Sequence, residues 1–122
     1  MIEVDPEKAP FGYEVRRMRM AAGRRQREVA EVLGNVSVPY VHDIERGHRN
    51  PPTLEKIHDL AELFKQPEKG DYLAERAIFQ RGSVTIVPRE DYHRMLLVVL
   101  DRQIRNGKVS KAKSKQIMKL ID

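Results

Sequence analysis

The sequence predicts an all-α protein with five short helices, then a short β-branched segment, then two further helices. Apolar residues recur every three or four positions through most of the chain, which is the helical period. Ser or Thr stands before three of these stretches, and Gly or Asn follows several of them. These residues are typical of helix starts and helix ends respectively.

The five helices expected in the first two thirds of the chain cover residues 11–22, 26–33, 38–47, 54–64 and 68–81. Gly34 and Asn35 end the second helix because both tolerate left-handed backbone. Ser37 caps the third, and Pro39 lies in its first turn, where a missing N–H does no harm. Ala30 supplies the small side chain that a close helix crossing needs.

The last third of the chain has a different pattern. Residues 83–87, S-V-T-I-V, are β-branched and either pair as a strand with the same segment of a second chain or form an extended linker. Residues 89–105 predict a strongly apolar helix, and Ser110 caps a final helix that reaches residue 121. More apolar surface is present than an isolated surface helix needs.

Charge and composition limit the possible functions. The net charge is +5, and residues 101–122 alone hold seven basic residues and two acidic ones. A polyanionic partner fits this distribution, although the charge also fits a merely soluble protein. The chain has no cysteine, which excludes disulfides and thiolate chemistry and fits a cytoplasmic protein. The longest apolar run has six residues, far short of a membrane span.

Residues 26–47 read Q-R-E-V-A-E-V-L-G-N-V-S-V-P-Y-V-H-D-I-E-R-G. This stretch resembles the helix-turn-helix of the phage repressor and Cro-like family, also called the XRE family. The matching positions are Gln26, Ala30, Gly34, Val36, Ser37, Val41, Ile44, Glu45, Arg46 and Gly47. The resemblance covers roughly residues 11–64. It implies a five-helix repressor-like domain over residues 11–81, between an N-terminal arm of residues 1–10 and a C-terminal region of residues 82–122.

The family binds double-stranded DNA through the helix that follows Ser37, and position and charge imply the contacts. Expected base contacts are Val38, Pro39, His42 and Arg49. Expected phosphate contacts are Arg24, Arg25, Gln26, Arg27, Tyr40, Arg46 and Asn50. The resemblance also pairs Arg19 with Glu45, which would fix the angle of the recognition helix.

Each of these contacts has a simpler alternative. His42 is then only solvated, Arg49 binds only phosphate, and Tyr40 packs on the turn. Val38 and Pro39 then serve the helix start alone.

The chain departs from the family pattern at two places. Arg25 stands where Ser or Thr is usual, so the side-chain cap of that helix is missing. In exchange, the helix N-terminus and the arginines around it form a seat for a phosphate. Asn35 adds one residue to the turn, which makes the base contacts less transferable than the fold.

Family members bind as dimers, and the C-terminal region is the expected interface. The residues expected there are Val84, Ile86, Tyr92, Leu96, Val99 and Leu100. The alternative is that this region only covers the bundle of one chain. The lysines of residues 111–119 either touch flanking phosphates or remain solvated.

The leading hypothesis is a homodimeric transcriptional repressor that binds an inverted-repeat operator. One alternative is an antitoxin that binds a toxin through its C-terminal region and its own promoter through the helix-turn-helix. Another is a protein-interaction adaptor that uses the fold without DNA. An enzyme is not expected, since the four His are scattered and no phosphate-binding loop occurs. No metal or cofactor and no membrane contact is expected.

Overall fold

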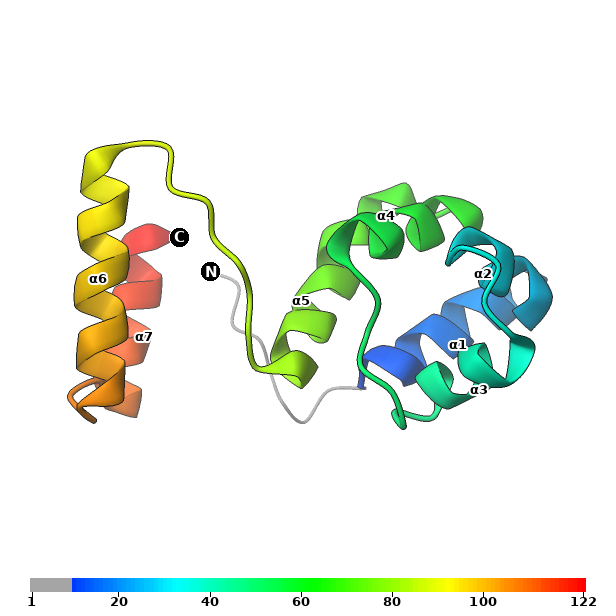
Figure 1. Cartoon of the computed structure of the whole chain (residues 1–122), viewed down its shortest axis with the longest axis horizontal. Coiled ribbons are helices and arrows are strands. Elements are labelled where there is room, and N and C mark those ends of the chain that lie inside the picture. The colour runs from blue at the N-terminus through cyan, green and yellow to red at the C-terminus, as the bar shows by residue number, and fades with distance from the viewer. Residues whose placement is uncertain (1–9) are drawn as a thin grey trace. The chain divides into compact units, whose positions relative to one another are not determined.

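The computed structural model describes residues 10–122, and these residues are helical with irregular connections (Figure 1). Residues 1–9, most of the expected N-terminal arm, lie outside the described part. The elements are α1 (Phe11–Ala21), α2 (Gln26–Val32), α3 (Val38–Glu45), α4 (Leu54–Leu63), a 3₁₀ turn η1 (Pro67–Lys69), α5 (Gly70–Arg81), α6 (Asp91–Arg105) and α7 (Lys111–Ile121).

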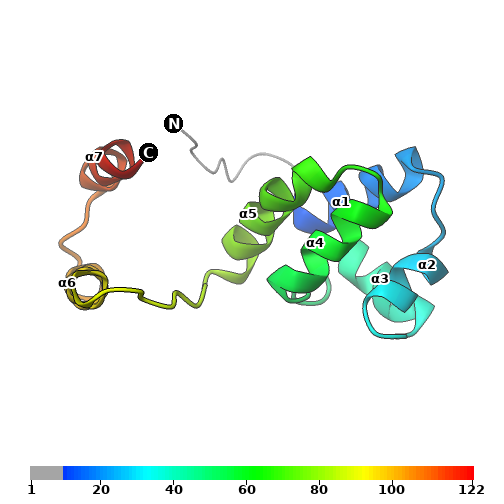
Figure 2. The ribbon, with the colours of Figure 1, turned by 90° about the horizontal axis from the view of Figure 1, so that it is seen from above.

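Two compact units make up the described residues, and the division falls between Val84 and Thr85. The first unit contains α1 to α5, and the second contains α6 and α7. Figures 1 and 2 show α4 beside α5 in the first unit.

The first unit has one apolar core. Side chains from all five helices and from the end of α4 enter it: Phe11, Val15, Met18, Val29, Ala30, Val41, Ile44, Ile57, Leu60, Ala61, Phe64, Leu73, Ala74 and Ala77. Because each helix contributes one stripe, the helical period of the sequence is explained by burial against the other four helices.

The turn between α2 and α3 uses the residues that the sequence indicated. Gly34 and Asn35 have φ values of 97° and 59°, both in the left-handed region. The Val36 N–H donates to the Ala30 carbonyl at 3.2 Å. Ser37 Oγ then accepts from the Tyr40 N–H at 3.2 Å and caps α3. The added residue Asn35 is thus accommodated in the turn, and α3 still begins directly after Ser37.

Helix α1 crosses α3 closely at Gly12. This residue is buried, and a Cβ built on it would collide with the backbone carbonyl groups of Ile44 and Glu45. Backbone cannot move aside as a side-chain tip can, so the crossing requires glycine at this position. The sequence indicated Ala30 of α2 as the small residue needed where α2 and α3 cross. It did not indicate Gly12.

A buried carboxylate links α1 to α5. Glu14 is 6% exposed, accepts from Arg17 Nη2 at 2.6 Å and accepts from the Tyr72 hydroxyl at 3.1 Å. Burial, together with the Glu14 carboxylate, raises the pKa of Tyr72 above its ordinary value. The hydrogen bond to Glu14 likewise raises the pKa of Arg17. Glu14 is therefore satisfied within the fold, as a buried charge must be.

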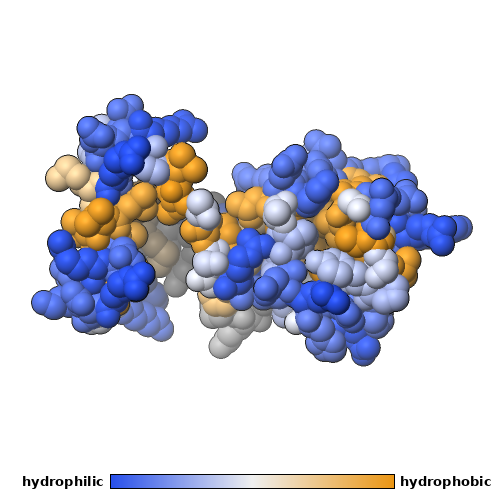
Figure 3. Space-filling view, in the orientation of Figure 1, coloured by the Kyte–Doolittle hydropathy of each residue, from blue (hydrophilic) through white to orange (hydrophobic). Residues whose placement is uncertain are grey.

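The second unit has well-formed helices with no buried residue. His93 Nδ1 accepts from the backbone N–H groups of Arg89 and Glu90 at 3.3 and 3.2 Å and caps α6. Ser110 Oγ accepts from the Lys113 N–H at 3.1 Å and caps α7. Exposed large apolar residues on these helices are Tyr92, Met95, Leu96, Val98, Val99, Ile104, Leu120 and Ile121. Apolar residues are also visible on the surface of this unit in Figure 3.

Residues 83–87, for which a strand was one of two interpretations, form no strand in the described chain. This segment is irregular, and Val84, Ile86 and Val87 are exposed. A strand needs the backbone of a second strand for its hydrogen bonds, and residues 10–122 contain none. The segment is the extended connection between the two units, which was the other interpretation of its sequence.

Two helix starts also differ from expectation. Helix α5 begins at Gly70 rather than residue 68 because Pro67–Lys69 form a 3₁₀ turn first. Helix α6 begins at Asp91 rather than residue 89, since Glu90 is the N-cap with extended backbone. No helix in the described range 10–122 has the length and apolar character that a membrane span requires.

Candidate nucleic-acid interface

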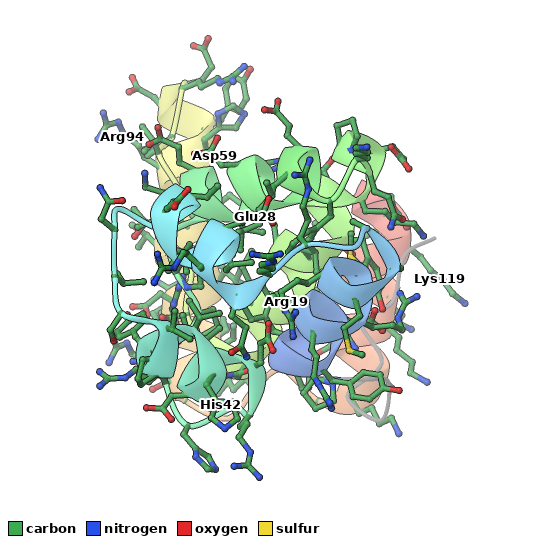
Figure 4. The ribbon with its side chains drawn as sticks, turned by 90° about the vertical axis from the view of Figure 1, so that its right-hand side faces the viewer. Arg19, Glu28, His42, Asp59, Arg94 and Lys119 are labelled. Atoms are coloured by element: carbon green, nitrogen blue, oxygen red, sulfur yellow. The ribbon has the colours of Figure 1, made fainter. Side chains whose placement is uncertain are left out.

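Helix α3 has an inner face and an outer face. Val41 and Ile44 are buried on the inner face, while Val38, Pro39 and His42 are exposed. Figure 4 shows His42 at the outer edge of the α1–α5 unit. The three α3 residues expected to contact bases are therefore accessible, and they come from the first five residues of the helix.

An open hollow with a volume of about 790 Å³ lies along one side of α3. We call it the basic hollow, and it is lined by Tyr13, Arg16, Arg19, Arg24, Arg25, Gln26, His42, Glu45 and Arg46. Three helices meet there: the middle of α1, the start of α2 and the end of α3. Five arginines converge on this hollow, and only one carboxylate, Glu45, is among its lining residues. An anionic group such as a DNA phosphate fits this charge.

The structure brings Arg19 and Glu45 together at the floor of the basic hollow. Arg19 Nε donates to Glu45 Oε2 at 2.6 Å, and Arg19 Nη2 donates to Oε1 at 3.1 Å. The two side chains are only 14% and 2% exposed. This bidentate pair joins α1 to α3 and so limits the rotation of α3 about its axis. Arg19 projects from α1 (Figure 4).

Gln26, one of the expected phosphate contacts, makes a hydrogen bond within the protein. Its Nε2 donates to Glu45 Oε1 at 3.1 Å, so the first residue of α2 is bonded to the same carboxylate as Arg19. Arg19 Nη1 also donates to the Arg24 carbonyl at 3.0 Å. Gln26 therefore positions the helices in the DNA-free protein.

The N-terminus of α2 is capped by Glu28. Its Oε1 accepts from the Arg25 N–H at 3.2 Å, and its Oε2 accepts from Arg24 Nη1 at 2.8 Å. The Arg25 backbone N–H, followed by the Arg24 guanidinium, holds the pKa of Glu28 below its usual value. Glu28, the third residue of the helix, thus supplies one half of a capping box by accepting from the N-cap N–H, whereas a Ser or Thr side chain would accept from the N–H of the third residue. The predicted phosphate seat at this N-terminus already holds a negative charge.

The arginines of the expected phosphate set consequently differ in availability. Arg24 is half-buried, pairs with Glu28 and donates from Nε to the Leu63 carbonyl at 3.3 Å. Arg25, Arg27 and Arg46 are exposed. Arg46 Nη1 lies 3.3 Å from His42 Nε2, at the rim of the basic hollow.

Arg49, Tyr40 and Asn50 line a second open hollow of about 700 Å³ on another side of α3. Asp43 also lines it, and the Arg49 guanidinium lies against both Tyr40 and Asp43. Arg27 and Val38 line a smaller hollow of about 290 Å³ at the α2–α3 turn. The expected DNA contacts therefore surround α3 instead of forming one cluster.

Sequence reasoning missed three residues of this surface. Tyr13 and Arg16 line the basic hollow. Arg16 stands three residues before Arg19 and so shares its helix face, a signal that was available in the sequence. The sequence placed Asp43 on the outer face of α3 but predicted no contact for it. Its contact with Arg49 forms only because the loop after α3 folds back.

The residues expected at the dimer interface belong to the connection and to α6. Val84, Ile86, Tyr92, Leu96 and Val99 are exposed, and Leu100 is half-buried. Among residues 10–122, no group of three or more His, Asp or Glu side chains is arranged to hold a metal ion.

A sequence model of the helix-turn-helix domain family matches residues 10–70 of this chain, which is half of its 122 residues. The match begins one residue before α1 and ends at the first residue of α5, so it includes α2, α3 and the basic hollow. No curated protein and no solved structure matches the chain. The match and the geometry around α3 agree, and the chain belongs to the helix-turn-helix domain family.

Proposed function

We propose that this protein is a transcriptional regulator of the phage repressor and Cro-like type that binds duplex DNA through α3. The observation that supports the proposal is the basic hollow beside the exposed face of α3. Phosphate contacts orient a protein on DNA, and base contacts supply sequence preference. In this proposal Arg16, Arg25 and Arg46 hold phosphates, and the exposed face of α3 enters the major groove.

The proposal includes a homodimer that acts as a repressor on an inverted-repeat operator. One helix-turn-helix covers only a few base pairs, and two of them separated by about 34 Å enter successive major grooves. The exposed apolar residues of α6 and α7 support a second copy as the partner. Tyr92, Met95, Leu96 and Val99 follow the i, i+3, i+4, i+7 spacing that puts them on one face of α6, which a second copy can cover.

A binding assay at several salt concentrations tests the proposal. The probes are a palindromic fragment selected from random duplexes and an unrelated duplex of equal length. Wild type is expected to prefer the selected fragment. Arg25→Ala and Arg46→Ala are each expected to lower the salt slope of binding by about 0.9, which is the effect of one lost phosphate contact. Lys65→Gln removes one positive charge in the turn after α4 and is the matched control.

The result that would overturn the proposal is equal affinity of the wild type for both duplexes at moderate salt. Light scattering of the free protein tests the homodimer separately. A monomer with intact α6 and α7 would favour a different protein as the partner of the second unit. That outcome supports the antitoxin or adaptor alternative, both of which use α6 and α7 for another chain.

A further inference from the structure

The loop after α3 folds back onto the outer face of that helix. Gly47 has a φ of 77°, a left-handed conformation that reverses the chain direction. The His48 N–H donates to the Asp43 carbonyl at 2.8 Å and closes the end of the helix. Because the chain reverses at Gly47, Arg49 lies against residues of α3 that come before the turn.

The guanidinium of Arg49 makes two contacts there. Its Cζ lies 4.5 Å from the centroid of the Tyr40 ring, and its Nε lies 3.7 Å from Asp43 Oδ2. Tyr40 and Asp43 are three residues apart and therefore lie on the same face of α3. The ring supports the plane of the cation, and the carboxylate lies at its edge.

The far end of the loop is also held. Arg81, the last residue of α5, donates from Nη2 to the carbonyl groups of Pro51 and Pro52 at 2.6 and 2.7 Å. The loop is therefore anchored to α3 at one end and to α5 at the other. Arg49 lies between these two anchors, and its side chain is 51% exposed.

Two ligands on DNA can take a guanidinium, a phosphate or a guanine. A phosphate drawn to Arg49 would come close to the Asp43 carboxylate, and the two negative charges repel. Guanine presents neutral acceptors, O6 and N7, spaced for two parallel N–H donors. A guanidinium carries five donors, so one edge can face Asp43 while the terminal Nη groups face a base. Asp43 thus favours a base over a phosphate as the ligand of Arg49.

We propose that Tyr40, Asp43 and Arg49 form one base-reading unit in which Arg49 donates to guanine O6 and N7. Tyr40 and Asp43 act as positioning residues. Asp43 also sets specificity, because a register that places a phosphate at Arg49 brings that negative charge close to the Asp43 carboxylate. The inference rests on the proposed binding of duplex DNA by α3.

The test is sequence selection by the full-length protein from random duplexes, followed by affinities for the selected site and for every single-base-pair change in it. Variants are Arg49→Lys, Asp43→Asn, Tyr40→Leu and Tyr40→Phe. Glu68→Gln, in the exposed η1 turn, removes one negative charge elsewhere and is the control for Asp43→Asn. Circular dichroism and thermal unfolding show that each variant is folded.

Arg49→Lys is expected to lose about 10-fold to 100-fold of discrimination at one G·C pair and to leave the other positions unchanged, because Lys cannot donate bidentately. Asp43→Asn is expected to lose several-fold discrimination at that same pair. It also gains more affinity for random DNA than Glu68→Gln does. Tyr40→Leu follows Asp43→Asn in its loss of discrimination, and Tyr40→Phe, which keeps the ring, loses less discrimination at that pair than Tyr40→Leu does.

Unchanged discrimination at every position in Arg49→Lys and Asp43→Asn would overturn the inference while the proposed function stands. The same holds for a uniform loss across all sequences with a lower salt slope, since that is the behaviour of a phosphate contact. A wild type that selects no sequence would overturn the proposed function, and this inference with it.

Discussion

The α1–α5 unit and the α6–α7 unit are built from similar amphipathic helices and differ in what covers their apolar faces. In the first unit the apolar stripes of all five helices are buried against one another. In the second unit neither helix has a buried residue, although α6 is the longest helix among residues 10–122. An apolar stripe therefore predicts that a face will be covered, and it does not say which molecule covers it.

The largest effect is expected from removing a core side chain of the first unit, which tests whether its apolar faces are covered within one chain. Leu60 in α4 is fully buried, and Leu60→Ala is expected to lower the free energy of unfolding by about 2–5 kcal/mol. Urea unfolding at two protein concentrations measures it. The loss should be the same at both, because this core lies within one chain. A concentration-dependent loss would mean that the first unit also depends on a second copy.

Glu45→Ala is the next largest change. It leaves Arg19 without its carboxylate in a half-buried site and removes the acceptor of Gln26. We expect a loss of about 3 kcal/mol in the free energy of unfolding. Glu45→Gln keeps the shape and one acceptor and should lose less. A double-mutant cycle with Arg19→Ala isolates the pair, and additive losses would show that the two residues are not coupled.

The helix caps and the Arg19–Glu45 pair show which contacts the sequence could predict. The caps at Ser37 and Thr53 follow from local chemistry, and both are present, since their hydroxyl groups accept from Tyr40 and Lys56 N–H. Arg19 and Glu45 are 26 residues apart, and only the family pattern indicated that they would meet. Local rules predict helix ends well because the interacting groups are three or four residues apart.

Contacts that depend on tertiary geometry were not predictable in the same way. The Gln26 amide meets Glu45 only after α2 has packed against α3. Arg49 reaches Tyr40 only after the loop has reversed. Glu28 is an exception, because an acid three residues after the position where Ser or Thr is usual is a local signal for a cap. That signal is present in the sequence.

A substitution in α6 tests whether a second copy of the chain covers the apolar face of the second unit. Leu96→Glu places a charge in the apolar face that the proposed dimer buries. We expect the dissociation constant of the dimer to rise roughly 30-fold, the effect of about 2 kcal/mol at a central interface residue. Sedimentation equilibrium measures the constant, and unfolding of the α1–α5 unit should not change. Arg102→Ala, an exposed residue of the same helix, is the control. Equal constants for Leu96→Glu and wild type would place the interface elsewhere.

The smallest expected effect concerns the cap of α2 and depends on pH. The folded-state pKa of Glu28 is lowered, so its contribution to stability is present above the unfolded-state pKa of about 4.3. The contribution disappears as pH falls through the lower folded-state value. Glu28→Ala should therefore lower Tm at pH 7 by a few degrees at most, and the difference from wild type should shrink below about pH 4.

Glu28→Gln separates the hydrogen bond from the charge in this experiment. Gln keeps an acceptor for the Arg25 N–H and has no titrating proton, so its Tm should lie between the other two at pH 7. A difference between wild type and Glu28→Ala that stays constant from pH 7 to pH 3 would contradict the assignment of the cap to the ionised carboxylate.

Gly12 has a consequence for how relatives of this protein should be recognised. Because the carbonyl groups of Ile44 and Glu45 occupy the space of its Cβ, the distance between the axes of α1 and α3 is set by the absence of a side chain. A chain with alanine or any larger residue at this position must hold α3 farther from α1, and α3 would then protrude differently toward the DNA. Glycine here is thus a marker of docking geometry, and its loss in a related chain would indicate a different approach to the groove.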